Sequence, residues 1–281
     1  MTPTDLNIIK SHFGKTPKDI ELSNLGSYSR AYIINKGEIV FKFKKRPGVT
    51  YKNEAKILKI IENLDLKINT QRIFCESEDD SFLALYGVKG KSVKSRTLSE
   101  PEKTKIAKNL AEFLKNLHAK TPENLNKTSL DAEISAWQER FARSEKALRN
   151  YLTETELRKA RNLILTRVPE KLKQLGEKPV FSHGDFWENN IFLDENNNLG
   201  IIDFSDAGYY DEAADFTYLE SDELTEKLLD FYDADETLRE KVRLRRLIKP
   251  MFVISAYLTP ENTPTLKSYA TKIKTSTSKL L

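Results

Sequence analysis

The chain has 281 residues, of which 39% are hydrophobic and 31% charged, and a formal net charge of +4, so it can bury a substantial core in one large domain or two modest ones. No apolar run approaches the roughly 18–20 residues that span a bilayer, and basic residues are dispersed among acids, so we expect neither a membrane nor a nucleic-acid partner. The single cysteine, Cys75, excludes an internal disulfide, and the first residues lack a signal-sequence pattern, so we expect a cytoplasmic protein, and a monomer.

The first part of the chain predicts a small antiparallel sheet with one main helix. A short helix over residues 1–14 ends at Gly14, and helical spacing favours a second, main helix over residues 49–63. Alternating apolar residues favour strands at residues 19–25, 29–35, 38–44, 70–76 and 81–87. The glycines in residues 86–90 predict a hinge, so we expect a β lobe over residues 1–87 and a larger lobe over residues 88–281.

The second part of the chain predicts a mostly helical lobe. Residues 101–118 have apolar side chains at helical spacing, and we interpret His118, at the end, as a structural cap or packing residue. Two long charged helices are expected over residues 130–150 and 153–175. Further helices are expected over residues 212–220, 222–233, 235–257 and 262–279. Together these elements predict an α+β fold.

Three polar residues, Asp185, Asn190 and Asp203, lie between the helices expected over residues 153–175 and 212–220. Two short apolar runs, residues 191–193 and 199–202, flank an Asn-rich turn, and this pattern predicts a β-hairpin. The hairpin would bring Asn190, at the start of its first strand, beside Asp203, at the end of its second strand. Asp185 would lie on the loop just before the hairpin.

This set of residue types indicates phosphoryl transfer. Magnesium prefers oxygen ligands, commonly one or two carboxylates together with substrate phosphates, and Asn190 and Asp203 supply such oxygens. Asp185 lies near them in the chain and is suited to orient or deprotonate an incoming hydroxyl. We expect His183 to brace the loop through hydrogen bonds rather than to transfer protons.

The stretch His183-Gly184-Asp185 with Asn190, followed by Ile202-Asp203, resembles the aminoglycoside phosphotransferase and choline kinase family, which shares its fold with protein kinases. Residues 203–216 are similar to the family pattern Asp-x-x-x-Ala-Gly-x-x-Asp-Pro-Ala-x-Asp-Leu. The resemblance implies a two-lobed, protein-kinase-like α+β fold. Its first lobe would be a small antiparallel sheet with one main helix, and its second a large, mostly helical lobe. The most similar branch is that of the aminoglycoside 2″-phosphotransferases.

The resemblance also implies roles for individual residues. Asp185 would be the catalytic aspartate, and Asn190 and Asp203 would be the magnesium ligands. Asp211 and Asp215 would brace the loop and helix behind the site.

The resemblance is weaker in the first part of the chain, where it implies the nucleotide site. Lys42 would bind the phosphates of ATP or GTP, and Glu54 would pair with Lys42. Ser27 is a candidate for contact with a phosphate. Kinases of this fold bind the base through the backbone of the hinge, so Leu85 and Val88 are candidates there.

One acidic segment gives information on the acceptor, which is the substrate whose hydroxyl would receive the phosphoryl group. Residues 203–236 contain thirteen acids and a single base, Lys227. Such a segment is either a solvated helix face or a negative wall that attracts a polycationic substrate such as an aminoglycoside. The carboxylates that we expect to contact substrate amines are Glu188, Asp206, Glu220 and Asp222.

Other acceptors stay open at this point. Choline would need an aromatic cage, and candidates for it are Trp187, Tyr209, Tyr210, Phe231 and Tyr232. The pair Phe186-Trp187 resembles the fructosamine kinase branch, so a sugar amine or a hydroxy-amino acid is a further alternative. An inactive nucleotide-binding regulator is the remaining one. Of all these functions, the one that we expect is a kinase that phosphorylates an aminoglycoside antibiotic and so confers resistance.

Overall fold

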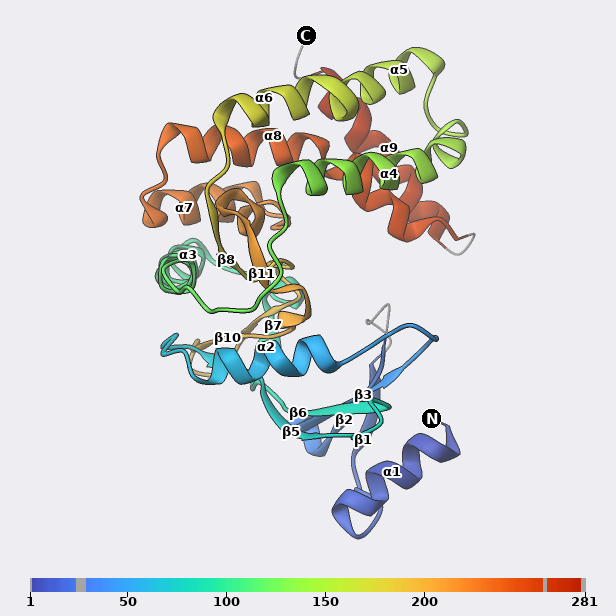
Figure 1. Cartoon of the computed structure of the whole chain (residues 1–281), viewed down its shortest axis with the longest axis vertical. Helices are drawn as coiled ribbons and strands as arrows, with labels where there is room; N and C mark the ends of the chain where they lie inside the picture. The colour runs from blue at the N-terminus through green and yellow to red at the C-terminus, as the bar shows by residue number, and fades with distance from the viewer. Residues whose placement is uncertain (1, 24–28, 260–261, 279–281) are drawn as a thin grey trace. The chain divides into compact units, whose positions relative to one another are not determined.

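The computed structural model describes residues 2–23, 29–259 and 262–278 (Figure 1). The chain divides into two compact units. The first unit contains Met1–Asn109 and Trp187–Ala207, and the second contains Leu110–Phe186 and Gly208–Leu281. The chain therefore returns to the first unit for one short segment. The lobe boundary expected at residues 87 and 88 stays a prediction.

The larger sheet of the first unit has five antiparallel strands in the order β1-β2-β3-β6-β5 (Figure 1). Their bounds are Ile20–Ser23 for β1, Ser29–Ile34 for β2, Ile39–Lys44 for β3, Arg72–Glu76 for β5 and Phe82–Tyr86 for β6. In β3, buried Phe41 and Phe43 alternate with partly exposed Lys42, as the sequence pattern predicted. Lys42 therefore lies on the opposite face of the sheet from the two phenylalanines.

Each face of this sheet is covered by one helix. Helix α1 (Pro3–Phe13) packs Ile9 against the cluster that contains Tyr32, Phe41 and Phe43. Helix α2 (Lys52–Glu62) lies on the other face, where it meets Lys42 (Figure 1). The alternation within β3 thus separates an apolar core from a face that carries the charged side chain of Lys42.

A second, smaller sheet in the first unit contains the predicted hairpin. Its strand order is β4-β10-β9-β7, with bounds Asn69–Thr70 for β4, Lys91–Ser92 for β7, Ile191–Leu193 for β9 and Leu199–Ile201 for β10. Val88 packs directly on Gly200, where a Cβ would lie 2.1 Å from the Cγ1 of Val88, so the packing requires glycine at this position. Gly90, at φ +112°, likewise approaches the backbone of Leu193. The expected hinge residues therefore pack closely on this hairpin.

The second unit consists mainly of helices, with the two-stranded sheet β8–β11 among them. Helix α3 (Glu100–His118) enters the unit at Leu110. The bounds of the other elements are Leu130–Leu148 for α4, Glu154–Asn162 for α5, Val168–Leu175 for α6, Pro179–Ser182 for β8, Gly208–Asp211 for β11, Asp222–Tyr232 for α7, Glu236–Val253 for α8 and Thr263–Ser278 for α9. Among the described residues, no helix is both long and apolar enough to cross a membrane.

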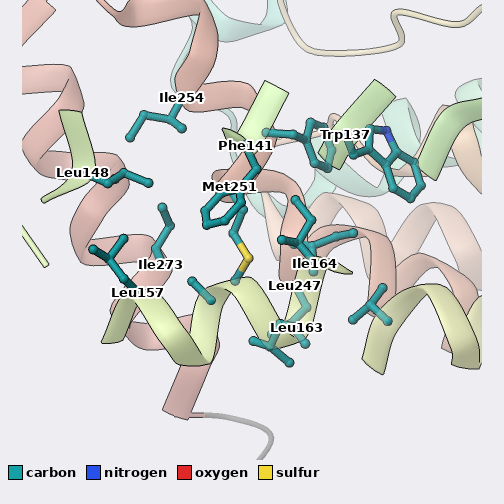
Figure 2. Packing of buried hydrophobic residues seen from close by; sticks show 14 of the residues in the cluster. Trp137, Phe141, Leu148, Leu157, Leu163, Ile164, Leu247, Met251, Ile254 and Ile273 are labelled. Atoms are coloured by element: carbon teal, nitrogen blue, oxygen red, sulfur yellow. The ribbon is translucent and has the colours of Figure 1, made fainter. Parts of the chain in front are cut away.

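The core of the second unit lies between α4, α5, α6, α8 and α9 (Figure 2). The ring of Trp137 stacks on that of Phe252, with centroids 5.3 Å apart. Between α5 and α6 the helix contains a π-helical turn, Leu163–Arg167, and Gln138 donates to the carbonyl oxygens of Ile164 and Leu165. The expected helix over residues 153–175 is therefore confirmed, apart from this wider turn.

The helix expected over residues 212–220 is wrong beyond Phe216. The structure has only a short 3₁₀ segment, Glu212–Phe216, which we call η5. The carbonyl oxygens of Tyr218 and Leu219 instead accept hydrogen bonds from Lys249 of α8, at 2.7 and 3.2 Å. Both residues would have been in the last turn of the expected helix, where carbonyl groups have no partner within the helix, and the bonds from α8 satisfy them.

Candidate active site

The hairpin β9–β10 brings the expected metal ligands to one end. The two strands pair antiparallel, with Ile191 opposite Ile201 and Leu193 opposite Leu199. One step further, the backbone N–H of Ile202 donates to the carbonyl oxygen of Asn190 at 3.0 Å. Asn190 and Asp203 therefore flank the open end of the hairpin, as the spacing of the apolar runs predicted.

The backbone of Asp203 has an unusual conformation. Its φ of 65° and ψ of 66° lie in the left-handed region, which Asp tolerates better than most residues with a Cβ. Its N–H donates to Oε1 of Gln71 at 2.9 Å, and the hydroxyl of Ser205 donates to its Oδ1 at 3.0 Å. The side chain is 39% exposed, so it is fixed by neighbours while remaining open to a ligand.

Lys42 lies between two carboxylates. Its Nζ donates to Oε1 and Oε2 of Glu54 at 2.7 and 2.9 Å, and lies 3.5 Å from Oδ1 of Asp203. Burial disfavours the charged ammonium, but the charges of Glu54 and Asp203 outweigh this and raise the pKa of Lys42. The pair expected from the sequence is therefore present, and the lysine stays a cation directed toward Asp203.

The donors in the first unit fit magnesium. They are one carboxylate, from Asp203, and one side-chain amide, from Asn190, whereas no group of three or more His, Cys, Asp or Glu side chains arranged for a metal occurs among the described residues. A complete cage of protein ligands suits calcium or zinc. A partial set, with phosphates and waters to complete it, suits magnesium bound to a nucleotide.

Asp185 lies in the second unit, on the loop after β8. Its backbone N–H donates to Nδ1 of His183 at 3.3 Å. His183 is fully buried, and its ring meets that of Phe186 edge-on, with centroids 5.6 Å apart. Phe186 in turn stacks on Phe113 of α3 at 5.9 Å. His183 thus packs and bonds within the loop, as a bracing residue does.

Asp215 is bonded to the backbone of the same loop. Its Oδ2 accepts from the N–H of His183 at 2.9 Å, and its Oδ1 accepts from the N–H of Gly184 at 3.0 Å. The carboxylate is fully buried and lies in η5, 30 positions after Asp185. The brace that the family resemblance implied therefore has a direct structural counterpart.

Asp211 has a different set of partners. Its side chain accepts from the backbone N–H groups of Lys178 and Ala213 at 3.0 and 3.2 Å, so it caps η5. It also pairs with Nζ of Lys241 at 2.8 Å and with Nη2 of Arg245 at 3.4 Å. Both cations come from α8 and are buried, and sequence patterns did not indicate them.

Arg245 further pairs with Glu133 of α4, with 2.6 Å between Nη1 and Oε2. Its guanidinium lies 5.2 Å from the ring centroid of Trp137.

Replacing Arg245 by Met should lower the free energy of unfolding by about 3–5 kcal/mol, because Glu133 would be left buried without its cation. Urea unfolding measures this change.

The control for this prediction is the double variant Glu133→Leu with Arg245→Met. Lys241 continues to pair with Asp211 in that variant, so no buried carboxylate is left without a cation. We expect it to recover most of the lost stability. A single Arg245→Met variant as stable as the wild type would show that the buried pair contributes nothing.

The four carboxylates expected to contact a substrate lie in different settings. Glu188 is buried in the first unit, where its carbonyl oxygen accepts from the N–H of Lys94 at 3.3 Å. Asp206, Glu220 and Asp222 are exposed, and Asp222 pairs with Arg246 of α8. Two further acids of α7 pair with Arg239 of α8, so arginines neutralise part of the acidic segment.

Two of the three residues expected to contact the base or the phosphates are among the described residues. Leu85 is fully buried in β6, and Val88 packs on Gly200. Ser27 lies outside the described residues. The roles of these residues in nucleotide binding stay predictions.

The chain is similar to known phosphotransferases. The model of the phosphotransferase enzyme family matches residues 20–245. An aminoglycoside 3'-phosphotransferase of Acinetobacter baumannii is 26% identical over 244 residues, which are 76% of this chain and 84% of that relative.

Solved structures share the fold. The gentamicin complex of APH(2″)-IIa has a TM-score of 0.73 at 20% identity, covering 97% of this chain and 96% of the other. The GDP and kanamycin complex of APH(2″)-IIIa has a TM-score of 0.77 at 21% identity, covering 99% of each chain. A macrolide 2'-phosphotransferase of Brachybacterium faecium has a TM-score of 0.66 at 15% identity, covering 96% and 98%. The expected protein-kinase-like α+β fold is confirmed, and the chain belongs to the phosphotransferase enzyme family.

Proposed function

We propose that this phosphotransferase transfers the γ-phosphoryl group of ATP or GTP to a hydroxyl of an aminoglycoside. The observation that carries the proposal is the group formed by Lys42, Glu54 and Asp203 beside the end of the hairpin at Asn190. These side chains offer a cation for phosphates together with two oxygen ligands for a divalent ion. Phosphoryl transfer needs this combination, because its catalysis is mostly positioning and neutralisation of charge.

Each residue has a distinct role in the proposal. Glu54 holds the ammonium of Lys42 toward the phosphates, and Asn190 and Asp203 bind Mg²⁺, which neutralises charge on the phosphates. Asp185 orients the acceptor hydroxyl and accepts its proton, and only four residues separate it from Asn190 in the chain. His183 and Asp215 fix the loop of Asp185 through the contacts described above.

The relatives support both substrates of the proposal. One solved complex contains gentamicin, another contains GDP and kanamycin, and a third, of APH(2″)-IIa, contains streptomycin and ATP. ATP and GTP are therefore both proposed as donors. The exposed acids Asp206 and Glu220 are proposed to attract substrate amines. Asp222 is proposed to attract them less, because Arg246 neutralises part of its negative charge.

A choline site is less well supported. Two of the aromatic residues expected to form its cage are engaged elsewhere. Tyr209 donates its hydroxyl to the carbonyl of Pro122, and Lys127 lies 5.5 Å from its ring centroid. Tyr232 hydrogen-bonds to His118 and packs edge-on against Phe216.

An acceptor screen tests the proposal. The purified chain is incubated with ATP or GTP, Mg²⁺ and one acceptor at a time, and release of the nucleoside diphosphate is measured. The acceptors are several aminoglycosides, a macrolide, choline, a fructosamine and a hydroxy-amino acid. We expect turnover with at least one aminoglycoside and a product that carries one phosphoryl group.

The matched control is Asp185→Asn, which should release diphosphate at least about 100-fold more slowly than the wild type. Turnover with choline or the sugar amine, and with no aminoglycoside, would show that the acceptor is that compound instead. Failure with every acceptor and both nucleotides would refute the kinase proposal.

A further inference from the structure

A row of hydrogen bonds connects α7 and α3 to the loop of Asp185 within the second unit. The hydroxyl oxygen of Tyr232 lies 2.8 Å from Nδ1 of His118. Nε2 of His118 lies 3.0 Å from Oδ2 of Asp215. The same carboxylate accepts from the N–H groups of His183 and Gly184. The side chains of His118 and Asp215 are 4% and 0% exposed, so water does not compete for the bond between them.

The direction of each hydrogen bond follows from the partners. Burial opposes ionisation of Asp215, but the hydrogen bond from His118 and the bond from the N–H of Gly184 lower its pKa, so the group is a carboxylate. A carboxylate only accepts, so Nε2 of His118 must be the donor to it. In the neutral ring Nδ1 then accepts, and the hydroxyl of Tyr232 donates to it. Burial raises the pKa of Tyr232, which keeps that proton on its oxygen.

Aromatic packing fixes the imidazole in place. Its ring meets that of Tyr232 edge-on at 5.6 Å and that of Phe216 at 6.4 Å. Phe216 and Tyr232 also meet edge-on, at 5.1 Å. Since Phe216 follows Asp215 directly in η5, the same packing orients the segment that carries the carboxylate.

We propose that His118 and Tyr232 are positioning residues for phosphoryl transfer. His118 fixes the rotation of the Asp215 carboxylate, and that carboxylate sets the backbone at His183 and Gly184, one step before Asp185. Tyr232 fixes the orientation and the tautomer of the imidazole. This inference rests on the proposed function, since it assigns a purpose to the placement of Asp185.

The kinetic test compares His118→Leu, His118→Gln and Tyr232→Phe. His118→Leu removes the donor to Asp215, and we expect kcat to fall about 100-fold while the KM for the nucleotide changes less than about twofold. The amide of His118→Gln can restore the donor, so its kcat should lie within about tenfold of wild type. Tyr232→Phe loses one neutral hydrogen bond and should lower kcat a few-fold, about 2- to 10-fold.

Leu157→Ala is the control for lost stability, because Leu157 is buried in the helical core and belongs to α5. We expect it to lower the melting temperature without lowering kcat at a temperature where the protein stays folded. Equal kcat values for wild type and His118→Leu would overturn the inference. So would equal losses in the Leu and Gln variants of His118.

Amide hydrogen exchange tests the inference without any turnover. In the wild type we expect slow exchange at His183 and Gly184, and in His118→Leu faster exchange at these two amides than elsewhere in β8 and α3. Exchange that stays as slow as in the wild type would show that His118 does not hold the loop. If the wild type phosphorylates no acceptor, the proposed function fails, while the exchange rates still decide the role of His118.

Discussion

Replacing Asp185 by Asn is expected to lower kcat for phosphoryl transfer by about 10²–10⁴-fold, the range for loss of a general base. The amide has nearly the same shape, so it preserves the packing of the loop. It cannot accept the proton of the acceptor hydroxyl at neutral pH. Because Asp185 is proposed to contact the acceptor rather than the cation, the affinity for the nucleotide with Mg²⁺ should stay near the wild-type value.

The two parts of this prediction are measured separately. Steady-state kinetics with a reactive aminoglycoside gives kcat, and calorimetric titration with an unreactive nucleotide analogue gives the affinity. A control in the same chain is Asp194→Asn, which changes an aspartate in the turn of the hairpin. Wild-type turnover by Asp185→Asn would show that this carboxylate is not the base.

Replacing Asp203 by Asn should weaken Mg²⁺-dependent nucleotide binding by at least about 100-fold, since losing even a neighbour of a metal ligand typically costs 10–100-fold in metal affinity. The substitution removes the only carboxylate among the proposed metal ligands. It also removes one of the two negative partners of Lys42, which lies 3.5 Å from Oδ1 of Asp203. Both effects reduce binding before any chemical step.

Titration with the nucleotide analogue in the presence and absence of Mg²⁺ measures this loss. We expect the wild type to bind much more tightly with Mg²⁺, and Asp203→Asn to lose most of that difference. Asp194→Asn, with the same change of charge on the same hairpin, should retain it. An undiminished magnesium effect in Asp203→Asn would place the cation elsewhere.

Short-range patterns in the sequence predicted the parts of the site that depend on neighbouring residues. The two apolar runs and the Asn-rich turn between them predicted the hairpin, so the approach of Asn190 to Asp203 followed from the pairing of its two strands. Likewise, the alternation in β3 placed Lys42 on the face opposite the aromatic core. Its pairing with Glu54, by contrast, was implied by the family resemblance rather than by a local pattern.

Contacts between distant segments could not be predicted in the same way. The acidic segment was interpreted with Lys227 as its only base, yet Arg239 and Arg246 of α8 pair with its acids. His118 was expected to be structural, which its packing agrees with, but its bond to Asp215 spans 97 positions. A residue's own neighbours in the sequence carry no information about such partners.

The central claim is that Asn190 and Asp203 bind the cation of a nucleotide whose phosphates meet Lys42, and that Asp185 meets the acceptor. A crystal structure with Mg²⁺, an unreactive nucleotide analogue and an aminoglycoside tests it most directly. We predict a cation ligated by side-chain oxygens of Asn190 and Asp203, and an acceptor hydroxyl hydrogen-bonded to Asp185. A nucleotide bound away from Lys42, or a cation held by other residues, would contradict the account.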